Sequence, residues 1–415
     1  MEISEASKQA IAQRMARLRT AVELKEGDRV PFIPKTDALP VTMYGLSQYD
    51  WMKDPRNALS CVEKYLTDYQ PDVAWSFGPG CIIDTCEVLG ATGIRVPGPT
   101  HGLPMTSSFQ MMNETYLLDE EFGEYLDDPT HFMLTKVYPR KFKNLEGLSN
   151  VSFHQLYDLA TMGEFCAMAA PPVGKAVETL LQAGRINAQN MGRAAILNQK
   201  AVEMGFPVRN VVMFTPFDLY ADSLRGLIRA VMDIKEFPDE VKAVTQRIGK
   251  LTIDSGIARA KAMGETLLYV PLHAGVDEFM SGDDYAEFYW PGLREIIDKA
   301  IAAGLTPYLF CEGKYNTRFD FLKNVPPKKV IYMFEQVDIA RAKRELEGIA
   351  CICGNLSSSL LCTGTPEKVA DATKRMLDTC APGGGFIMDC SSVLSDAKRE
   401  NFDAWYETTM TYGCY

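Results

Sequence analysis

Histidine is scarce in this 415-residue chain, which contains only His101, His131, His154 and His273. A metal site would therefore depend chiefly on sulfur and carboxylate ligands. No stretch approaches the ~20 consecutive apolar residues that a membrane-spanning helix needs, and the N-terminus is acidic where a signal peptide is basic. These absences predict a cytoplasmic protein without a membrane-spanning segment.

Basic residues are outnumbered, with 43 Lys and Arg against 54 Asp and Glu and a net charge of −11. A protein of this charge is not expected to bind nucleic acid or anionic membranes, because both repel negative charge. The eleven cysteines are odd in number and irregularly spaced. Buried, reduced thiols are the simplest interpretation of them, and metal binding is the functional alternative.

From about residue 170 onward, uniformly apolar runs alternate with helical patterns. Such runs are typical of parallel strands covered by helices, and they lie at 208–214, 267–271, 306–310, 329–334, 349–353 and 386–388. No Gly-x-Gly-x-x-Gly turn follows the first strand, so a barrel is favoured over a dinucleotide-binding sheet. The sequence predicts an α/β fold, a (β/α)₈ TIM-like barrel with extra N-terminal helices.

The earlier part of the chain is less regular. Residues 72–77 are a strand candidate, and residues 78–165 are expected to form loops and short elements over a cavity, with an acidic helix near 119–126. No linker divides the chain. We therefore expect residues 1–415 to form one domain, with residues 1–70 as a helical extension packed on the barrel.

Active sites of such barrels lie at the carboxyl ends of the strands. The chemically active residues at the expected strand ends are His273, Cys311, Glu312, Cys351, Cys353 and Cys390. Thiolates from several strands, together with a carboxylate or an imidazole, are typical ligands of catalytic zinc. Each cysteine alone is better explained as a small buried apolar residue, and it is their expected convergence on one rim that favours a metal.

A substrate pocket is expected near the same rim. Met111, Phe214 and Phe217 could line it as apolar side chains, and Asn355 follows one of the strands with cysteines. For each apolar residue taken singly, packing in the core is the alternative.

Several motifs give the chain a resemblance to a known family. They are Asp28-Arg29-Val30-Pro31, Phe217-Asp218-Leu219-Tyr220, Phe288-Tyr289-Trp290-Pro291, Cys353-Gly354-Asn355-Leu356, Gly364-Thr365-Pro366-Glu367 and Gly384-Gly385-Phe386-Ile387. In these motifs and in their order, the chain resembles the uroporphyrinogen decarboxylase superfamily over most of its length. The resemblance implies a (β/α)₈ barrel.

The branches of that superfamily match unequally. The decarboxylases carry an Arg-Gln-Ala-Gly-Arg-Tyr run whose arginines hold substrate carboxylates, whereas residues 31–38 here read PFIPKTDA. Zinc methyltransferases acting on methanol- or methylamine-derived methyl groups carry a His-x-Cys motif, which the sequence around Cys311 lacks. Ether-cleaving methyltransferases of O-demethylase systems are more similar. Some have an Asp, 27 residues, a Cys, 39 residues and a second Cys, the spacing of Asp283, Cys311 and Cys351.

This last resemblance implies a zinc ion held by Asp283, Cys311 and Cys351. Asp283 also fits the start of the following helix. If it belongs only to that helix, the ligand that replaces it would be His273, Glu312 or Cys390. The candidates for catalytic or supporting roles around the metal are His273, Glu312, Lys314, Tyr315 and Asn355.

The reaction implied by the resemblance is zinc-dependent cleavage of a small aromatic methyl ether, with the methyl group passing to the Co(I) centre of a corrinoid protein. The chain has no Asp-x-His-x-x-Gly segment for binding a corrinoid, so that cofactor is expected on a separate partner. Methyl transfer to a thiol, a different methyl donor and a decarboxylase-like lyase are the alternatives on the same barrel. A binding protein with structural cysteines is the alternative from another class, and the chain could form a homodimer.

Overall fold

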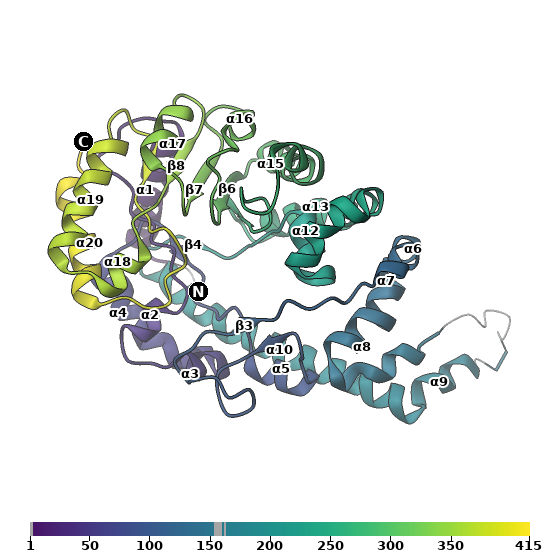
Figure 1. Ribbon diagram of the computed structural model, residues 1–415. Helices are drawn as coiled ribbons and strands as arrows, with labels where there is room; N and C mark the ends of the chain where they lie inside the picture. The colour runs from purple at the N-terminus through teal and green to yellow at the C-terminus, as the bar shows by residue number, and fades with distance from the viewer. Residues whose placement is uncertain (1–2, 153–159, 162) are drawn as a thin grey trace.

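Five parallel strands form one side of a barrel in the computed structural model, which describes residues 3–152, 160–161 and 163–415 (Figure 1). Each strand pairs with the next in the order β5 (Leu267–Leu272), β6 (Thr306–Cys311), β7 (Ile331–Phe334), β8 (Cys351–Cys353) and β9 (Phe386–Ile387). Almost all their side chains are buried. This burial on both faces explains why the corresponding sequence runs are apolar throughout.

Three further segments extend this arrangement on its two sides. They are β1 (Ala74–Trp75), β4 (Val208–Arg209) and the extended segment 30–36. β1 and β4 pair in parallel, and Val212, just beyond β4, bridges to Tyr269 of β5. On the other side, Phe32 bridges to Met388, just beyond β9. The predicted (β/α)₈ barrel fold is confirmed.

The two faces of each strand belong to different parts of the core. On β6, Tyr308 and Phe310 lie in the cluster that fills the barrel, whereas Leu309 and Cys311 lie in the cluster between the barrel and the helices. Successive residues of a strand point to opposite faces. The position of a residue within its strand therefore decides whether its side chain can reach a site inside the barrel.

Helices surround the barrel (Figure 1). After β4 they are α11 (Pro216–Tyr220), α12 (Leu227–Glu236), α13 (Pro238–Ala262), α14 (Gly282–Asp284), α15 (Trp290–Ala302), α16 (Phe319–Leu322), α17 (Ile339–Glu345), α18 (Ser358–Thr363), α19 (Pro366–Cys380) and α20 (Arg399–Tyr412). The N-terminal helices are α1 (Glu5–Val22), α2 (Leu39–Thr42), α3 (Gln48–Lys53) and α4 (Leu59–Tyr69). No helix in the described ranges is both long and apolar enough to cross a membrane.

A second group of elements extends away from the barrel as an arm (Figure 1). Its backbone is the 33-residue helix α10, and its members are α5 (Ile83–Leu89), β2 (Ile94–Arg95), β3 (Gln110–Met111), α6 (Phe122–Asp127), α7 (Pro129–Phe132), α8 (Tyr138–Lys141), α9 (Cys166–Ala169) and α10 (Pro171–Glu203). The acidic segment 119–126 is helical, as predicted, with a 3₁₀ turn at Asp119–Glu121 leading into α6.

Candidate active site

Three neighbouring cavities meet at the carboxyl ends of the strands, and His273 lines all three. The barrel cavity, about 980 Å³, is lined among others by Lys35, Trp75, Arg209, Phe214, Tyr269, His273 and Glu312. The apolar cavity, about 700 Å³, includes Phe109, Met111, Met112, Phe214, Leu219, Leu227 and Ile228. The acidic cavity, about 460 Å³, includes Asp222, Glu278, Glu312 and Glu335. A side chain at this junction can act on a molecule in any of the three.

His273 follows the last residue of β5 and is held between two carboxylates. Its Nδ1 lies 2.7 Å from Oδ2 of Asp222, and its Nε2 lies 3.5 Å from Oε2 of Glu312. Burial lowers the pKa of His273, but the hydrogen bond with Asp222 and the charges of neighbouring carboxylates outweigh burial and raise it to about 9. The imidazole is therefore protonated at neutral pH and can donate a proton.

Asp218 of α11 holds the backbone beneath His273. Its carboxylate is completely buried and accepts hydrogen bonds from the Ala274 amide at 2.9 Å and the Tyr289 hydroxyl at 2.7 Å. Burial raises the pKa of Asp218 to about 6, against the lowering effect of the nearby His273. Because these bonds tie β5 to α11, they fix the distance between His273 and the turn that carries Asp222.

The apolar cavity is built mainly by the arm and by the segment after β4. Met111 of β3 is 57% exposed, and Phe214 packs edge-on against His273 with ring centroids 5.7 Å apart. Sulfur and aromatic side chains of this kind suit a flat aromatic ligand. Met111 and Phe214 therefore line a cavity next to His273, where the sequence placed a substrate pocket.

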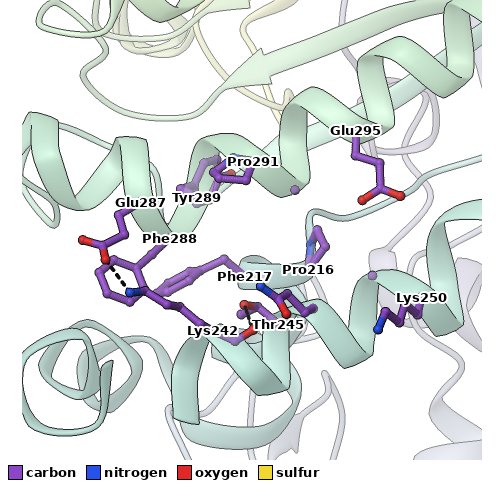
Figure 2. A pocket seen from close by; sticks show the side chains of 13 residues that line it. Pro216, Phe217, Lys242, Thr245, Lys250, Glu287, Phe288, Tyr289, Pro291 and Glu295 are labelled. Atoms are coloured by element: carbon purple, nitrogen blue, oxygen red, sulfur yellow. Dashed lines mark hydrogen bonds and ion pairs between the residues drawn. The ribbon is translucent and has the colours of Figure 1, made fainter. Parts of the chain in front are cut away.

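Phe217 lies elsewhere. It is 1% exposed and faces a pocket of about 410 Å³ between α13 and the start of α15, outside the barrel (Figure 2). Lys242 and Glu287 form an ion pair at the edge of that pocket. His273 does not line it. Phe217 thus has the core-packing role that the sequence left as its alternative.

Two other predicted site residues support the framework. Tyr315 is completely buried, and its hydroxyl donates a hydrogen bond to the Leu272 carbonyl at 3.0 Å. Asn355 donates from Nδ2 to the carbonyls of Glu335 and Val337 at 3.1 and 2.8 Å. Glu312, in contrast, lines both the barrel cavity and the acidic cavity. Of these three, Glu312 is the one that the structure brings to His273.

The structure does not bring the predicted zinc ligands together. Cys311 is the last residue of β6 and packs among the outer helices, whereas Cys351 is the first residue of β8 and lies inside the barrel. Asp283 is exposed on α14, where Ser281 caps the helix by accepting a hydrogen bond from the Asp284 amide. Side chains alternate between the two faces of a strand, and this alternation separates Cys311 from Cys351, whereas Asp283 lies on a helix.

Cys390 does not complete a metal site either. Its thiol donates a hydrogen bond to the Ser392 carbonyl at 2.9 Å, and burial raises its pKa well above the usual value. Within the described residues, no group of three or more His, Cys, Asp or Glu side chains is arranged to hold a metal ion. The residues expected to bind zinc therefore do not fit a common ion in this structure.

Three residues that line these cavities were not expected from the sequence. Asp222 lies in a segment adjoining one of the family motifs, but its partnership with His273 depends on a contact across 51 residues of chain. Lys35 and Arg209 are each less than a tenth exposed and line the barrel cavity. The sequence did contain a sign of these two residues, because a basic residue inside an otherwise apolar strand is unusual.

Comparisons with known proteins agree with this architecture. A family model described as uroporphyrinogen decarboxylase (URO-D) matches residues 194–412. Over 164 residues, the chain is 27% identical to the methylcobamide:CoM methyltransferase MtbA of Methanosarcina acetivorans, a stretch that covers 38% of this chain and 47% of that protein. The chain thus matches about half the length of this curated relative.

A solved structure extends the likeness to nearly the whole chain. A methyltransferase from Methanosarcina mazei superposes with a TM-score of 0.60 at 14% sequence identity, covering 96% of this chain and 98% of that one. At this level of identity, the likeness concerns the fold alone.

Proposed function

Because this chain belongs to the uroporphyrinogen decarboxylase family, and because a protonated histidine lies at the junction of its cavities, we propose that it is a methyltransferase that works with a separate corrinoid protein. The reaction we assign is cleavage of an aryl methyl ether. A cavity at this junction receives the ring, and His273 acts on the ether oxygen. The position of His273, bonded to Asp222 and lining all three cavities, is the observation that carries this assignment.

The chemistry requires a proton donor. An aryl methyl ether resists cleavage because the departing oxygen leaves as a phenolate, and a positioned acid lowers that barrier. The C–O bond breaks as the methyl carbon bonds to the nucleophile, and the Nε2 proton of His273 passes to the phenolate oxygen. A corrinoid on the partner protein would supply the Co(I) nucleophile that takes the methyl group. Asp222 keeps the imidazole oriented and stabilises its charged form.

Methyl transfer to a thiol fits His273 less well. A thiol acceptor must lose its proton before it attacks, because the thiolate is the nucleophile. His273, with a pKa of about 9, already holds its proton at neutral pH and is a poor base there. Since the predicted zinc ligands do not meet, no step of the proposal depends on a metal.

The proposal is tested by incubating the protein with a methoxyarene, with and without a reduced corrinoid protein. We expect the ether to remain intact without the corrinoid protein, and to yield phenol and methylated corrinoid in equal amounts with it. Chromatography of the phenol and the absorption spectrum of the corrinoid measure the two products. Demethylation without any corrinoid, or preferred methylation of a thiol, would contradict the assignment.

The pH dependence of turnover gives a second prediction. A general acid works while it is protonated, so kcat/KM, which reports the free enzyme, should be steady at neutral pH and fall as the pH rises through about 9. Asp222→Asn removes a negative charge that raises the pKa of His273, so the fall should begin at a lower pH. A pH–rate profile of both proteins measures the shift. An unchanged alkaline limb in the variant would show that His273 is not the titrating acid.

A further inference from the structure

Two buried cations line the barrel cavity, Lys35 and Arg209, and neither forms an ion pair within the described residues. Arg209 is 6% exposed; within the described residues its side chain makes one hydrogen bond, from Nη1 to the Val211 carbonyl at 3.0 Å. Its Nε has no partner. Lys35 is 4% exposed, and its Nζ contacts aromatic rings in place of an acceptor. Burying a charge without a partner is costly, so these two residues require an explanation.

Other buried arginines of this protein are paired. Arg225 binds Asp233 through Nε and Nη2 at 2.6 and 2.7 Å, and the partly buried Arg17 binds Asp72 at 2.5 Å. Arg318 lies 3.6 Å from Asp277 and donates to three backbone carbonyls. Arg225 and Arg318 thus each lie beside a carboxylate, whereas Arg209 forms no ion pair in the described structure and lines a cavity.

The unpaired donors gather around the same two rings. Arg209 lies 3.8 Å from the ring centroid of Trp75 and 4.5 Å from that of Tyr269. Lys35 Nζ lies 4.9 Å from the Tyr269 centroid and 3.3 Å from that of Phe310. The indole nitrogen of Trp75 is also buried without a partner. Three kinds of donor therefore surround one part of the cavity.

Burial and the charge of Arg209 both disfavour the charged form of Lys35. Burial is the main reason that the pKa of Lys35 falls to about 7 and that of Arg209 to about 10. The charges of Glu312 and Asp389 raise the pKa of Lys35, and the charge of Arg209 lowers it. The cavity also holds the carboxylates of Glu312 and Asp37, but neither forms an ion pair with these cations in the described structure. An anion between them would relieve both the repulsion and the missing hydrogen bonds.

We propose that Lys35 and Arg209 bind an anionic group of the substrate, a carboxylate or a sulfonate, against the rings of Trp75 and Tyr269. Both cations contact Tyr269, which lies four residues before His273 along β5. A small aromatic acid held there by its charge presents its other end toward His273. Binding of the anion does not require methyl transfer. The inference rests on the proposed function only in that the methyl ether is taken as the end of the substrate that reacts.

Calorimetric titration of the full chain without corrinoid protein tests the site. The probes are 4-methoxybenzoate, its neutral match 4-methoxybenzamide, and 2-mercaptoethanesulfonate. We expect at least one anion to bind about tenfold or more tightly than the amide, because a charge-assisted contact is replaced by a neutral one. The anion preferred identifies the headgroup: the benzoate supports a carboxylate, and the sulfonate supports a sulfonate.

Variants separate a binding role from a structural one. Arg209→Met and Lys35→Met should each abolish the preference for the anion, with an unchanged or higher Tm because no internal ion pair is lost. Lys242→Met, in the pocket outside the barrel, is the matched control and should bind as the unchanged protein does. Equal binding of anion and amide by the unchanged protein, or an anion preference that survives both cavity variants, would overturn the site.

The outcome is distinguishable from failure of the proposed function. If the protein binds anions selectively but does not cleave the ether when reduced corrinoid protein is added, the anion site is supported and the methyltransferase assignment is wrong. Cleavage of neutral and anionic methoxyarenes with equal kcat/KM would keep the assignment and remove the anion site.

Discussion

Replacing His273 by Gln is expected to lower kcat for ether cleavage by about 10²- to 10⁴-fold, the usual contribution of a positioned general acid. Gln can still donate a hydrogen bond but cannot deliver a proton. The fold should be retained, because the His273 side chain is 30% exposed and its removal opens no closed cavity. Single-turnover rates with reduced corrinoid protein in excess measure the chemical step, and circular dichroism checks the fold.

Varying the acidity of the released phenol tests directly whether His273 donates a proton. Ethers of acidic phenols leave without help from a proton, so the deficit of His273→Gln should shrink as the pKa of the released phenol falls. His101→Gln is the matched control, because His101 accepts a hydrogen bond from the Val96 amide and lines none of the three cavities. A deficit of equal size for every phenol would indicate that His273 positions the substrate and transfers no proton.

Replacing Arg225 by Met should cost about 3–5 kcal/mol of unfolding free energy, the cost of leaving a buried charge without its partner. The Arg225 side chain is completely buried, and it joins Asp233 of α12 to Asp119 and the Leu117 carbonyl of the arm. The variant leaves the Asp233 carboxylate, also completely buried, without its principal cation. Chemical denaturation followed by fluorescence measures the loss.

Arg229→Met is the comparison for that variant. Arg229 bonds to the same two aspartates, at 2.9 Å to Asp119 and 3.2 Å to Asp233, but its side chain is 25% exposed. Partly exposed ion pairs contribute at most about 1 kcal/mol, so Arg229→Met should lose far less. Similar losses in both variants would show that burial does not set the strength of this cluster.

The barrel could be predicted from the sequence because its signals are local. Uniformly apolar runs such as 306–310 and 349–353 appear in the structure as β6 and β8, since a strand buried on both faces admits few polar residues. His273 and Glu312 were placed correctly at strand ends for the same reason. A residue just past the end of a parallel strand reaches the cavity edge of a barrel whatever its neighbours are.

The structure places Cys311 and Cys351 apart for a reason that their spacing in sequence does not carry. Cys311 pairs in register with Phe334, and Cys351 with Ile331, three residues earlier on the same strand β7. The two thiols therefore differ both in face and in height along the barrel. A count of residues between cysteines is blind to register, which is fixed by hydrogen bonds between strands.

The contact between His273 and Asp222 could not be predicted from the sequence either. Asp222 reaches His273 because a π-type turn, Ala221–Arg225, follows α11 at the rim of the barrel. Nothing in the local pattern distinguishes this aspartate from an exposed one. Lys35 and Arg209, by contrast, could have been found by asking which strands carry a charge on the face that points inward.

The long helix α10 links the arm to the barrel cavity, and its contacts at both ends constrain the length of the helix. Toward its C-terminus, Met191, Ala194 and Asn198 form part of the barrel cavity wall, while its earlier turns pack against the rest of the arm. Each residue of an α-helix adds about 100° of rotation and 1.5 Å of rise. Deleting one residue between the two sets of contacts would turn the arm by more than a quarter circle about the helix axis. Surface loops tolerate insertions and deletions, but this part of α10 should not, because its length sets the orientation of the arm relative to the barrel cavity.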